Sequence, residues 1–161
     1  MPYSYEPHYF EDMEEGKTFL SAGRTITESD FVMHSMFTGD WTELHTNTEY
    51  SDDGPYGARI AQGPMTFIVA TGLLQRTGIV ERTVFAFLGM NYMDLKQAVY
   101  IGDTLQAEYE CTEKRELSSR DDAGVVVIDT HVHNQDDEEV FAGDMKFMWR
   151  KRSHYGESEA E

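Results

Sequence analysis

The order of hydrophobic and polar residues predicts one strand and two helices in the first half of the chain. β-branched and aromatic residues between positions 17 and 26 indicate a first strand. Thr27–Asp30 then supplies the capping residue and first-turn acids that open a helix, which we expect to end at Gly39. Residues 64–76 are apolar on nearly all sides of a second helix that has proline in its first turn. We therefore expect this second helix to be buried.

The second half of the chain is rich in β-branched residues and alternates between apolar and polar positions. It predicts four strands separated by polar turns, at residues 84–94, 104–117, 123–135 and 139–151. With the first strand, the economical arrangement is an α+β fold in which one antiparallel sheet curls around the central helix. The 161 residues suffice for one such domain, which we place at residues 5–152, with 153–161 as a polar acidic tail.

Acidic residues dominate the charge of the chain. Asp and Glu number 30 against 13 Lys and Arg, which gives a net charge of −17. Such a field repels nucleic acid and anionic membranes, because both are bound through clustered cations. Acid spread over the whole surface keeps a protein hydrated at high salt, so we expect a halophilic archaeon as the source. The alternative is an ordinary acidic protein with a solvated surface.

The cysteine content and the first residues indicate a reducing, cytoplasmic location. Cys111 is the single cysteine, which excludes an intramolecular disulfide and a multi-cysteine metal centre. It lies in a predicted strand, where we interpret it as a small core residue. The first residues lack a cationic start followed by an apolar run, and no segment of the sequence reaches the length of a membrane span.

Candidate chemistry concentrates in the polar segment between the two predicted helices, which we interpret as a structured loop from residue 40 to residue 59. Asp40 and His45 are five residues apart, a spacing that places side chains on divergent faces of a regular helix. They can converge on one water molecule only if the helix has already ended, which Gly39 permits. A carboxylate and an imidazole brought together can activate water as an acid and base pair.

The order of these motifs resembles the MaoC-like hydratase family, which includes the R-specific enoyl-CoA hydratases. The resemblance rests on Gly39-Asp40-x-x-x-Leu44-His45, Arg59-Ile60-Ala61-x-Gly63 before the apolar helix, and a late Gly102-Asp103 turn. It extends from about residue 9 to residue 147. It implies a single hotdog domain, an acyl-CoA substrate, no cofactor beyond the coenzyme A of the substrate, and a homodimer.

The resemblance also implies roles for individual residues. Asp40 and His45 correspond to the catalytic pair, and Gly63 to the glycine whose N–H polarises the thioester carbonyl. Thr71, Arg59 and Gln62 are expected to contribute to substrate binding. The chain departs from the family pattern at four positions, namely Thr42 and Glu43 in place of Asn and Pro, Gln62 in place of His, and Ala98 in place of Pro.

We therefore expect reversible hydration of an enoyl-CoA with an (R)-3-hydroxyacyl-CoA product. Arg59, Arg76 and Arg82 are candidates for binding the coenzyme A phosphates. A hotdog thioesterase, which would direct water at the thioester carbonyl, is one alternative. A binding module that has lost turnover is another.

His131 and His133 share one face of a predicted strand, a spacing that could hold zinc if carboxylates joined them. The sequence shows no further ligand pattern, so we interpret them as an exposed pair and expect no metal site.

Overall fold

The computed structural model describes residues 7–155 of the chain. The residues before and after this range, including the last six of the predicted tail, lie outside the description. The helical elements are η1 (Phe10–Asp12), α1 (Glu28–Thr38), α2 (Glu43–Thr46), α3 (Thr48–Asp52), α4 (Gly63–Arg76) and α5 (Arg152–Tyr155). The strands are β1 (Thr18–Leu20), β2 (Arg24–Thr25), β3 (Val84–Gly89), β4 (Met93–Leu95), β5 (Thr104–Glu116), β6 (Ala123–His133) and β7 (Glu139–Arg150).

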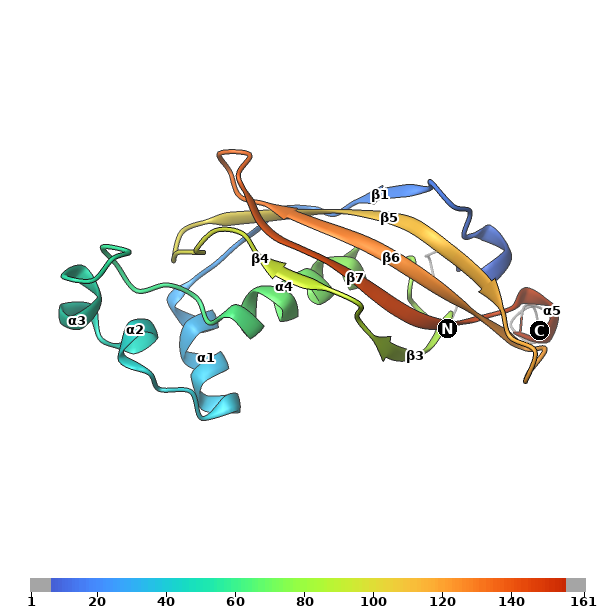
Figure 1. The fold of residues 1–161 in the computed structure, drawn as a ribbon, viewed down its shortest axis with the longest axis horizontal. Helices are drawn as coiled ribbons and strands as arrows, with labels where there is room; N and C mark the ends of the chain where they lie inside the picture. The colour runs from blue at the N-terminus through green and yellow to red at the C-terminus, as the bar shows by residue number, and fades with distance from the viewer. Residues whose placement is uncertain (1–6, 156–161) are drawn as a thin grey trace, which may run out of the picture.

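The strands form one antiparallel sheet, as predicted. Its order is β1-β5-β6-β7-β3, with β2 also paired to β5 and β4 also paired to β7. The three long strands β5, β6 and β7 follow one another through short turns and form the centre of the sheet (Figure 1). The alternating pattern of β5 places one set of its side chains in the core, where every second residue from Leu105 to Cys111 is fully buried. The first six residues of β6 are buried on both faces.

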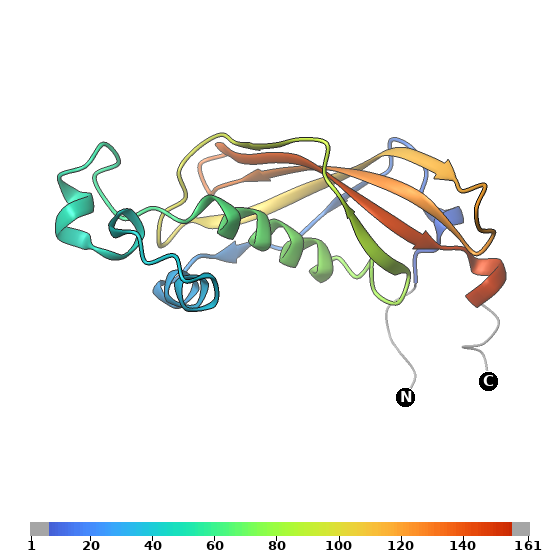
Figure 2. The same cartoon turned by 60° about the horizontal axis from the view of Figure 1, so that its bottom comes forward.

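Helix α4 lies against the concave side of the curved sheet (Figure 2), which confirms the predicted α+β architecture. Its inner face is buried, and includes Met65, Val69, Leu73 and Leu74. The hydroxyl of the buried Tyr109 on β5 donates to the carbonyl of Ala70 at 2.7 Å and fixes the helix on the sheet. No helix among the described residues is both long and apolar enough to span a membrane.

One side of α4 is exposed in the single chain, although the sequence predicted burial on nearly all sides. Ile68 on α4 is 48% exposed. The neighbouring edge of the sheet also exposes Phe87, Met93 and Leu95. The prediction of complete burial is therefore wrong for this chain alone, because the sheet covers only one face of the helix.

Two predicted strands are each divided in two. At Ser21, the side-chain hydroxyl accepts the hydrogen bond from the N–H of Ala107 at 2.9 Å. The first predicted strand is interrupted there and is divided into β1 and β2. In residues 84–94, the chain turns after Gly89, which has a φ of 119°. The Asp144 carboxylate accepts from the N–H groups of Asn91 and Tyr92 in that turn, so the strand divides into β3 and β4.

The segment from residue 40 to residue 59 contains two short helices, α2 and α3, rather than the predicted loop alone. Asn47 caps α3, because its side-chain oxygen accepts from the N–H of Tyr50. The buried hydroxyl of Ser51 donates to the carbonyl of Leu44 at 3.1 Å and ties α3 to α2. This pair of helices lies beyond one end of the sheet, next to α1 (Figure 1).

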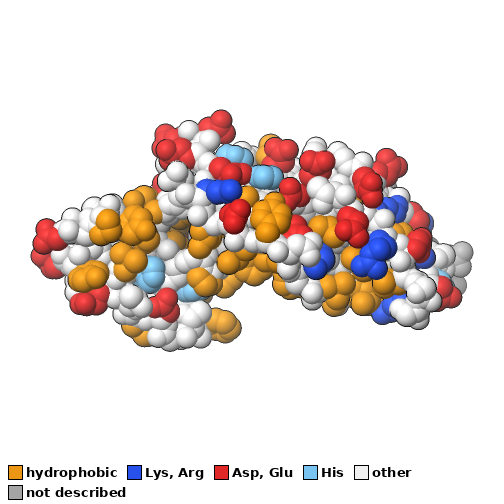
Figure 3. All heavy atoms as spheres, viewed as in Figure 1, with side chains coloured by type: hydrophobic (Ala, Val, Ile, Leu, Met, Phe, Trp, Pro, Cys, Tyr) orange, Lys and Arg blue, Asp and Glu red, His pale blue; other side chains and the backbone are white. Residues whose placement is uncertain are grey.

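The outer surface separates acidic from apolar regions (Figure 3). In that view, acidic side chains are scattered over the strands, and hydrophobic side chains gather over the α2–α3 segment and along the lower edge of the molecule. Helix α1 adds a strongly exposed apolar side chain, Phe37, at 88% exposure. Part of the apolar surface therefore lies around the segment that carries the candidate site.

Candidate active site

The end of α1 sets the position of Asp40. Thr27 begins the helix with a capping box that involves Asp30, and Gly39 ends it in the left-handed conformation with a φ of 77°. The N–H of Gly39 donates to the carbonyl of Ser35 at 2.8 Å. The next N–H, that of Asp40, donates to the hydroxyl of Thr38 at 3.2 Å. The helix therefore ends immediately before Asp40, as the sequence predicted.

The carboxylate of Asp40 is held by Thr42, two residues further on. Oδ1 accepts from the Thr42 hydroxyl at 2.6 Å and from the Thr42 N–H at 3.2 Å. The side-chain and backbone bonds from Thr42 lower the pKa of Asp40, with a smaller contribution from His45. Asp40 is consequently a carboxylate at neutral pH, and its second oxygen, Oδ2, faces His45.

His45 belongs to α2, and its ring is oriented by the chain that leads into α4. Its Nδ1 lies 2.7 Å from the carbonyl oxygen of Ile60, which can only accept, so Nδ1 carries a proton. In the neutral ring, Nε2 is then an acceptor, and it lies 3.9 Å from Oδ2 of Asp40. A water about 2.8 Å from both acceptors would span them with an angle of roughly 90° at its oxygen. The two side chains can therefore accept hydrogen bonds from both O–H groups of one water molecule.

Gly63 lies at the N-terminus of α4 and shares a pocket with His45. The pocket has a volume of about 310 Å³. It is lined by His45, Tyr56, Ile60, Ala61, Gly63, Thr66 and the run from Leu95 to Val99. The first N–H groups of a helix have no partners within it and carry the positive end of the helix dipole. The pocket therefore joins a candidate water-activating group to a candidate anion-stabilising amide.

Gly63 lies close to a side chain from the sheet edge. A Cβ atom at this position would lie 2.4 Å from Cδ1 of Leu95 on β4. The preceding residues are fixed by the N–H of Ala61, which donates to the carbonyl of Val99 at 2.8 Å, and by a bridge between Ile60 and Tyr100. The N-terminus of α4 is thus held against the segment that precedes β5.

None of the three residues predicted to bind substrate is among those that line this pocket, and their roles remain predictions. The guanidinium of Arg59 forms two hydrogen bonds to Glu28, at 2.9 and 2.5 Å. Gln62 is buried and donates through Nε2 to the hydroxyl of Ser35, while its side-chain oxygen has no protein partner. Thr71 is about 12 Å further along the axis of α4 than Gly63, and it is not among the residues that line the pocket.

Two residues near the candidate pair of Asp40 and His45 were not assigned to the site from the sequence. Thr42 was treated as a departure from the family motif, yet its hydroxyl orients Asp40. A hydroxyl two residues after an aspartate is the signal that could have identified it. The second residue is His34, which is buried on α1. Burial lowers the pKa of His34, while the nearby charges of Asp40 and His45 act on it in opposite directions.

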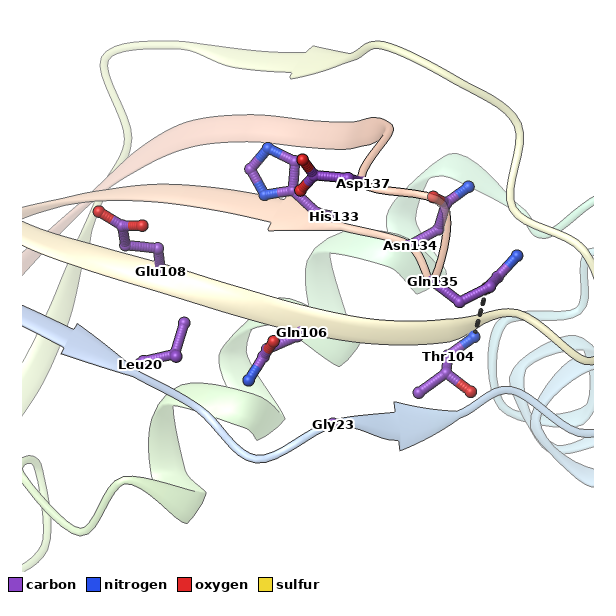
Figure 4. Close-up of a pocket in the computed structure, with 9 residues that line it drawn as sticks. All are labelled: Leu20, Gly23, Thr104, Gln106, Glu108, His133, Asn134, Gln135 and Asp137. Carbon is purple, nitrogen blue, oxygen red and sulfur yellow. Dashed lines mark hydrogen bonds between the residues drawn. The ribbon is translucent and has the colours of Figure 1, made fainter.

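The strand histidines lie away from this pocket. Nδ1 of His131 is 2.5 Å from Glu139, and Nε2 is 3.3 Å from Asp129. His133 lines a separate polar pocket of about 450 Å³ together with Glu108 and Asp137 (Figure 4). Within residues 7–155, no group of three or more His, Cys, Asp or Glu side chains converges in a way that could hold a metal.

The model of the MaoC-like domain family matches residues 11–133, which include Asp40, His45 and Gly63. The chain belongs to the MaoC-like family. Its match to the Protein MaoC of Klebsiella aerogenes is 31% identical over 106 residues, covering 66% of this chain and 31% of that protein. The chain therefore spans about a third of the length of that relative. Its match to the (R)-specific enoyl-CoA hydratase of Rhodospirillum rubrum is 30% identical and covers 76% of this chain and 87% of the relative.

Solved structures similar to this MaoC-like chain cover most of its length. The monoamine oxidase regulatory protein from Archaeoglobus is 31% identical, with a TM-score of 0.83, over 90% of this chain and 95% of that one. The architecture is the hotdog fold, shared with solved structures that match at TM-scores of 0.72 and 0.77. Relatives named as hydratases and dehydratases place the chain in a hydratase family without specifying its substrate.

Proposed function

We propose that this MaoC-like chain is an acyl-CoA hydratase that adds water reversibly to the double bond of an enoyl-CoA thioester. The observation that carries the proposal is the geometry of Asp40 and His45. Two acceptor atoms face each other across 3.9 Å, and both side chains are fixed by hydrogen bonds to neighbouring groups. A water held in this way directs its oxygen lone pairs away from the two acceptors, toward a substrate.

In the proposed reaction, the water oxygen bonds to the β carbon while Asp40 accepts one of its protons. The electrons of the double bond move toward the thioester carbonyl, whose oxygen gains negative charge. The N–H of Gly63 and the N-terminal dipole of α4 stabilise that charge. The α carbon then takes a proton from the Asp40–His45 pair, so that H and OH have been added overall. Dehydration uses the same groups in reverse.

The finer expectations from the sequence belong to this proposal. We infer an R product, because the relatives include a hydratase named for that stereochemistry. A cytoplasmic location is consistent with the single buried cysteine. A halophilic archaeal source is supported by the net charge of −17.

A homodimer is supported by the apolar edge of the sheet. Phe87 on β3, Met93 and Leu95 on β4, and Ile68 on α4 are all exposed in the single chain, and β3 and β4 both pair with β7. An unpaired strand edge flanked by such side chains favours pairing with a second copy. The proposed dimer would complete the burial of α4 that the sequence predicted.

The experiment that tests the proposal follows the loss of the enoyl-thioester absorbance of crotonyl-CoA in molar potassium chloride, beside a free-thiol assay. We expect absorbance to fall without thiol release, and Asp40→Asn to lower kcat by about 10²- to 10⁴-fold. Asp121→Asn, in the exposed turn between β5 and β6, is the matched control and should retain full activity.

The other outcomes contradict the proposal in different ways. Release of free thiol would indicate a thioesterase. Tight binding of crotonyl-CoA without turnover, and unaffected by Asp40→Asn, would indicate a binding module.

A further inference from the structure

The pocket that contains His45 and Gly63 also contains a positive charge. Among the residues that line it, Lys96 is the one cation. The chain has 13 Lys and Arg against 30 Asp and Glu, so a cation in the lining of a candidate site is scarce in this protein. Its position next to Leu95, the side chain that lies over Gly63, places it on the edge of the sheet at the pocket.

Two of the three arginines suggested by the sequence, Arg59 and Arg76, are less well placed for the same purpose. The guanidinium of Arg59 is engaged by both carboxylate oxygens of Glu28. Arg76 ends α4, thirteen residues after Gly63, which is about 20 Å along the helix axis. It donates to the carbonyl of Gly23, at the opposite end of the helix from the pocket.

Lys96 combines a fixed backbone with an exchangeable side-chain partner. Its N–H donates to the carbonyl of Val140 at 3.0 Å, which holds the residue on β7. Its ammonium group lies 3.3 Å from the carboxylate of Asp94, and these side chains are 43% and 57% exposed. Exposed pairs of this kind contribute little to stability, so a ligand anion can replace Asp94 without a large penalty.

We propose that Lys96 binds an oxyanion of the thioester substrate, either a phosphate of coenzyme A or a carboxylate at the far end of the acyl group. This inference rests on the proposed hydratase function. The N-terminus of α4 opens on the same pocket, and its dipole adds to the positive potential that such an anion meets. In a chain of net charge −17, this local potential offsets the repulsion that a polyanionic substrate meets at the rest of the surface.

The test compares Lys96→Met, which removes the charge and keeps an unbranched apolar side chain, with Lys96→Arg, which keeps the charge. Lys114→Met, near the opposite end of β5, makes the same change in net charge and serves as the control. Each variant is assayed with crotonyl-CoA, with crotonyl-pantetheine, which lacks the phosphates, and with an enoyl-pantetheine that carries a terminal carboxylate. Assays use the lowest salt at which circular dichroism shows the protein folded, because salt screens this contact.

We expect Lys96→Met to raise KM about tenfold, with kcat nearly unchanged, for whichever thioester carries the recognised anion. An effect on crotonyl-CoA that is absent with crotonyl-pantetheine identifies the phosphates. An effect confined to the enoyl-pantetheine that carries the terminal carboxylate identifies the acyl carboxylate. Lys96→Arg should retain most of the affinity in either case. A KM within twofold of that of Lys114→Met for all three substrates would overturn the proposal.

Failure of this inference can be separated from failure of the hydratase proposal. Equilibrium binding of the same three thioesters to the same variants is measured by calorimetry, which needs no turnover. If the protein binds an anionic thioester through Lys96 but does not hydrate crotonyl-CoA, the anion site is supported and the hydratase proposal is contradicted. Unchanged affinity in Lys96→Met, with hydration intact, would contradict the proposed anion site and leave the hydratase proposal in place.

Discussion

Substitution of Gly63 by alanine separates catalysis from stability in this protein. The added methyl carbon would lie 2.4 Å from Cδ1 of Leu95, whereas ordinary contacts begin near 3.4 Å, so about 1 Å of overlap must be relieved. Leu95 is 49% exposed at the sheet edge, so its flexible end can move away. Alanine is also favoured over glycine in a helix by up to about 1 kcal/mol. We expect the melting temperature to change by no more than about 4 °C.

The effect on hydration should be much larger. A thioester that approaches the N–H at residue 63 would be displaced by about the same 1 Å, and a misplacement of that size costs roughly 100-fold in rate. The assay is kcat/KM for crotonyl-CoA in Gly63→Ala, measured beside thermal unfolding. The double variant Gly63→Ala with Leu95→Ala tests the cause of any loss. Activity that stays low in the double variant means that the methyl group itself blocks the thioester.

Two results would refute this reasoning. Wild-type kcat/KM in Gly63→Ala would show that the thioester does not approach this amide. A fall in melting temperature of more than 10 °C would show that the overlap is not absorbed by the mobile end of Leu95.

Two further substitutions test the orientation of the catalytic pair and the packing of the core. Thr42→Val removes the hydroxyl bond that most lowers the pKa of Asp40, so this pKa should rise and the acidic limb of the pH–rate profile should move to higher pH. Thr42→Ser should keep the wild-type profile, and an unchanged profile in Thr42→Val would contradict the assigned role. Leu73→Ala should destabilise the protein by about 2–5 kcal/mol, because Leu73 is fully buried between α4 and the sheet. Chemical denaturation would measure this loss, and a loss below about 1 kcal/mol would mean that the core is looser than described.

The sequence predicted the larger elements of the fold because their signals are local. Thr27 and Gly39 mark the two ends of α1, and both positions are confirmed by their backbone conformations. Alternation located β5, and residues rich in β-branched and aromatic side chains between polar turns located β6 and β7. These features depend on residues that are neighbours in the chain.

The missed features depend on contacts between distant residues or on elements too short to show a period. The division of residues 84–94 is made by Asp144, more than fifty residues away, which caps the turn between β3 and β4. Helices α2 and α3 contain four and five residues, fewer than the two turns from which helical periodicity can be recognised. The tautomer of His45 likewise depends on the carbonyl of Ile60, fifteen residues further along the chain.

The placement of Asp40 and His45, the proposed catalytic pair, has a consequence for how this fold can diversify. Asp40 and His45 lie in a segment that contributes no strand to the sheet between residues 40 and 59, all of which are described. Helix α4 and the long strands supply the core, while the segment is attached to α1 through the Arg59–Glu28 pair and continues into the bridge between Ile60 and Tyr100. Insertions or exchanges in α2 and α3 can therefore reshape the mouth of the pocket without rebuilding the core. Substrate preference and folding stability can change independently in such an architecture.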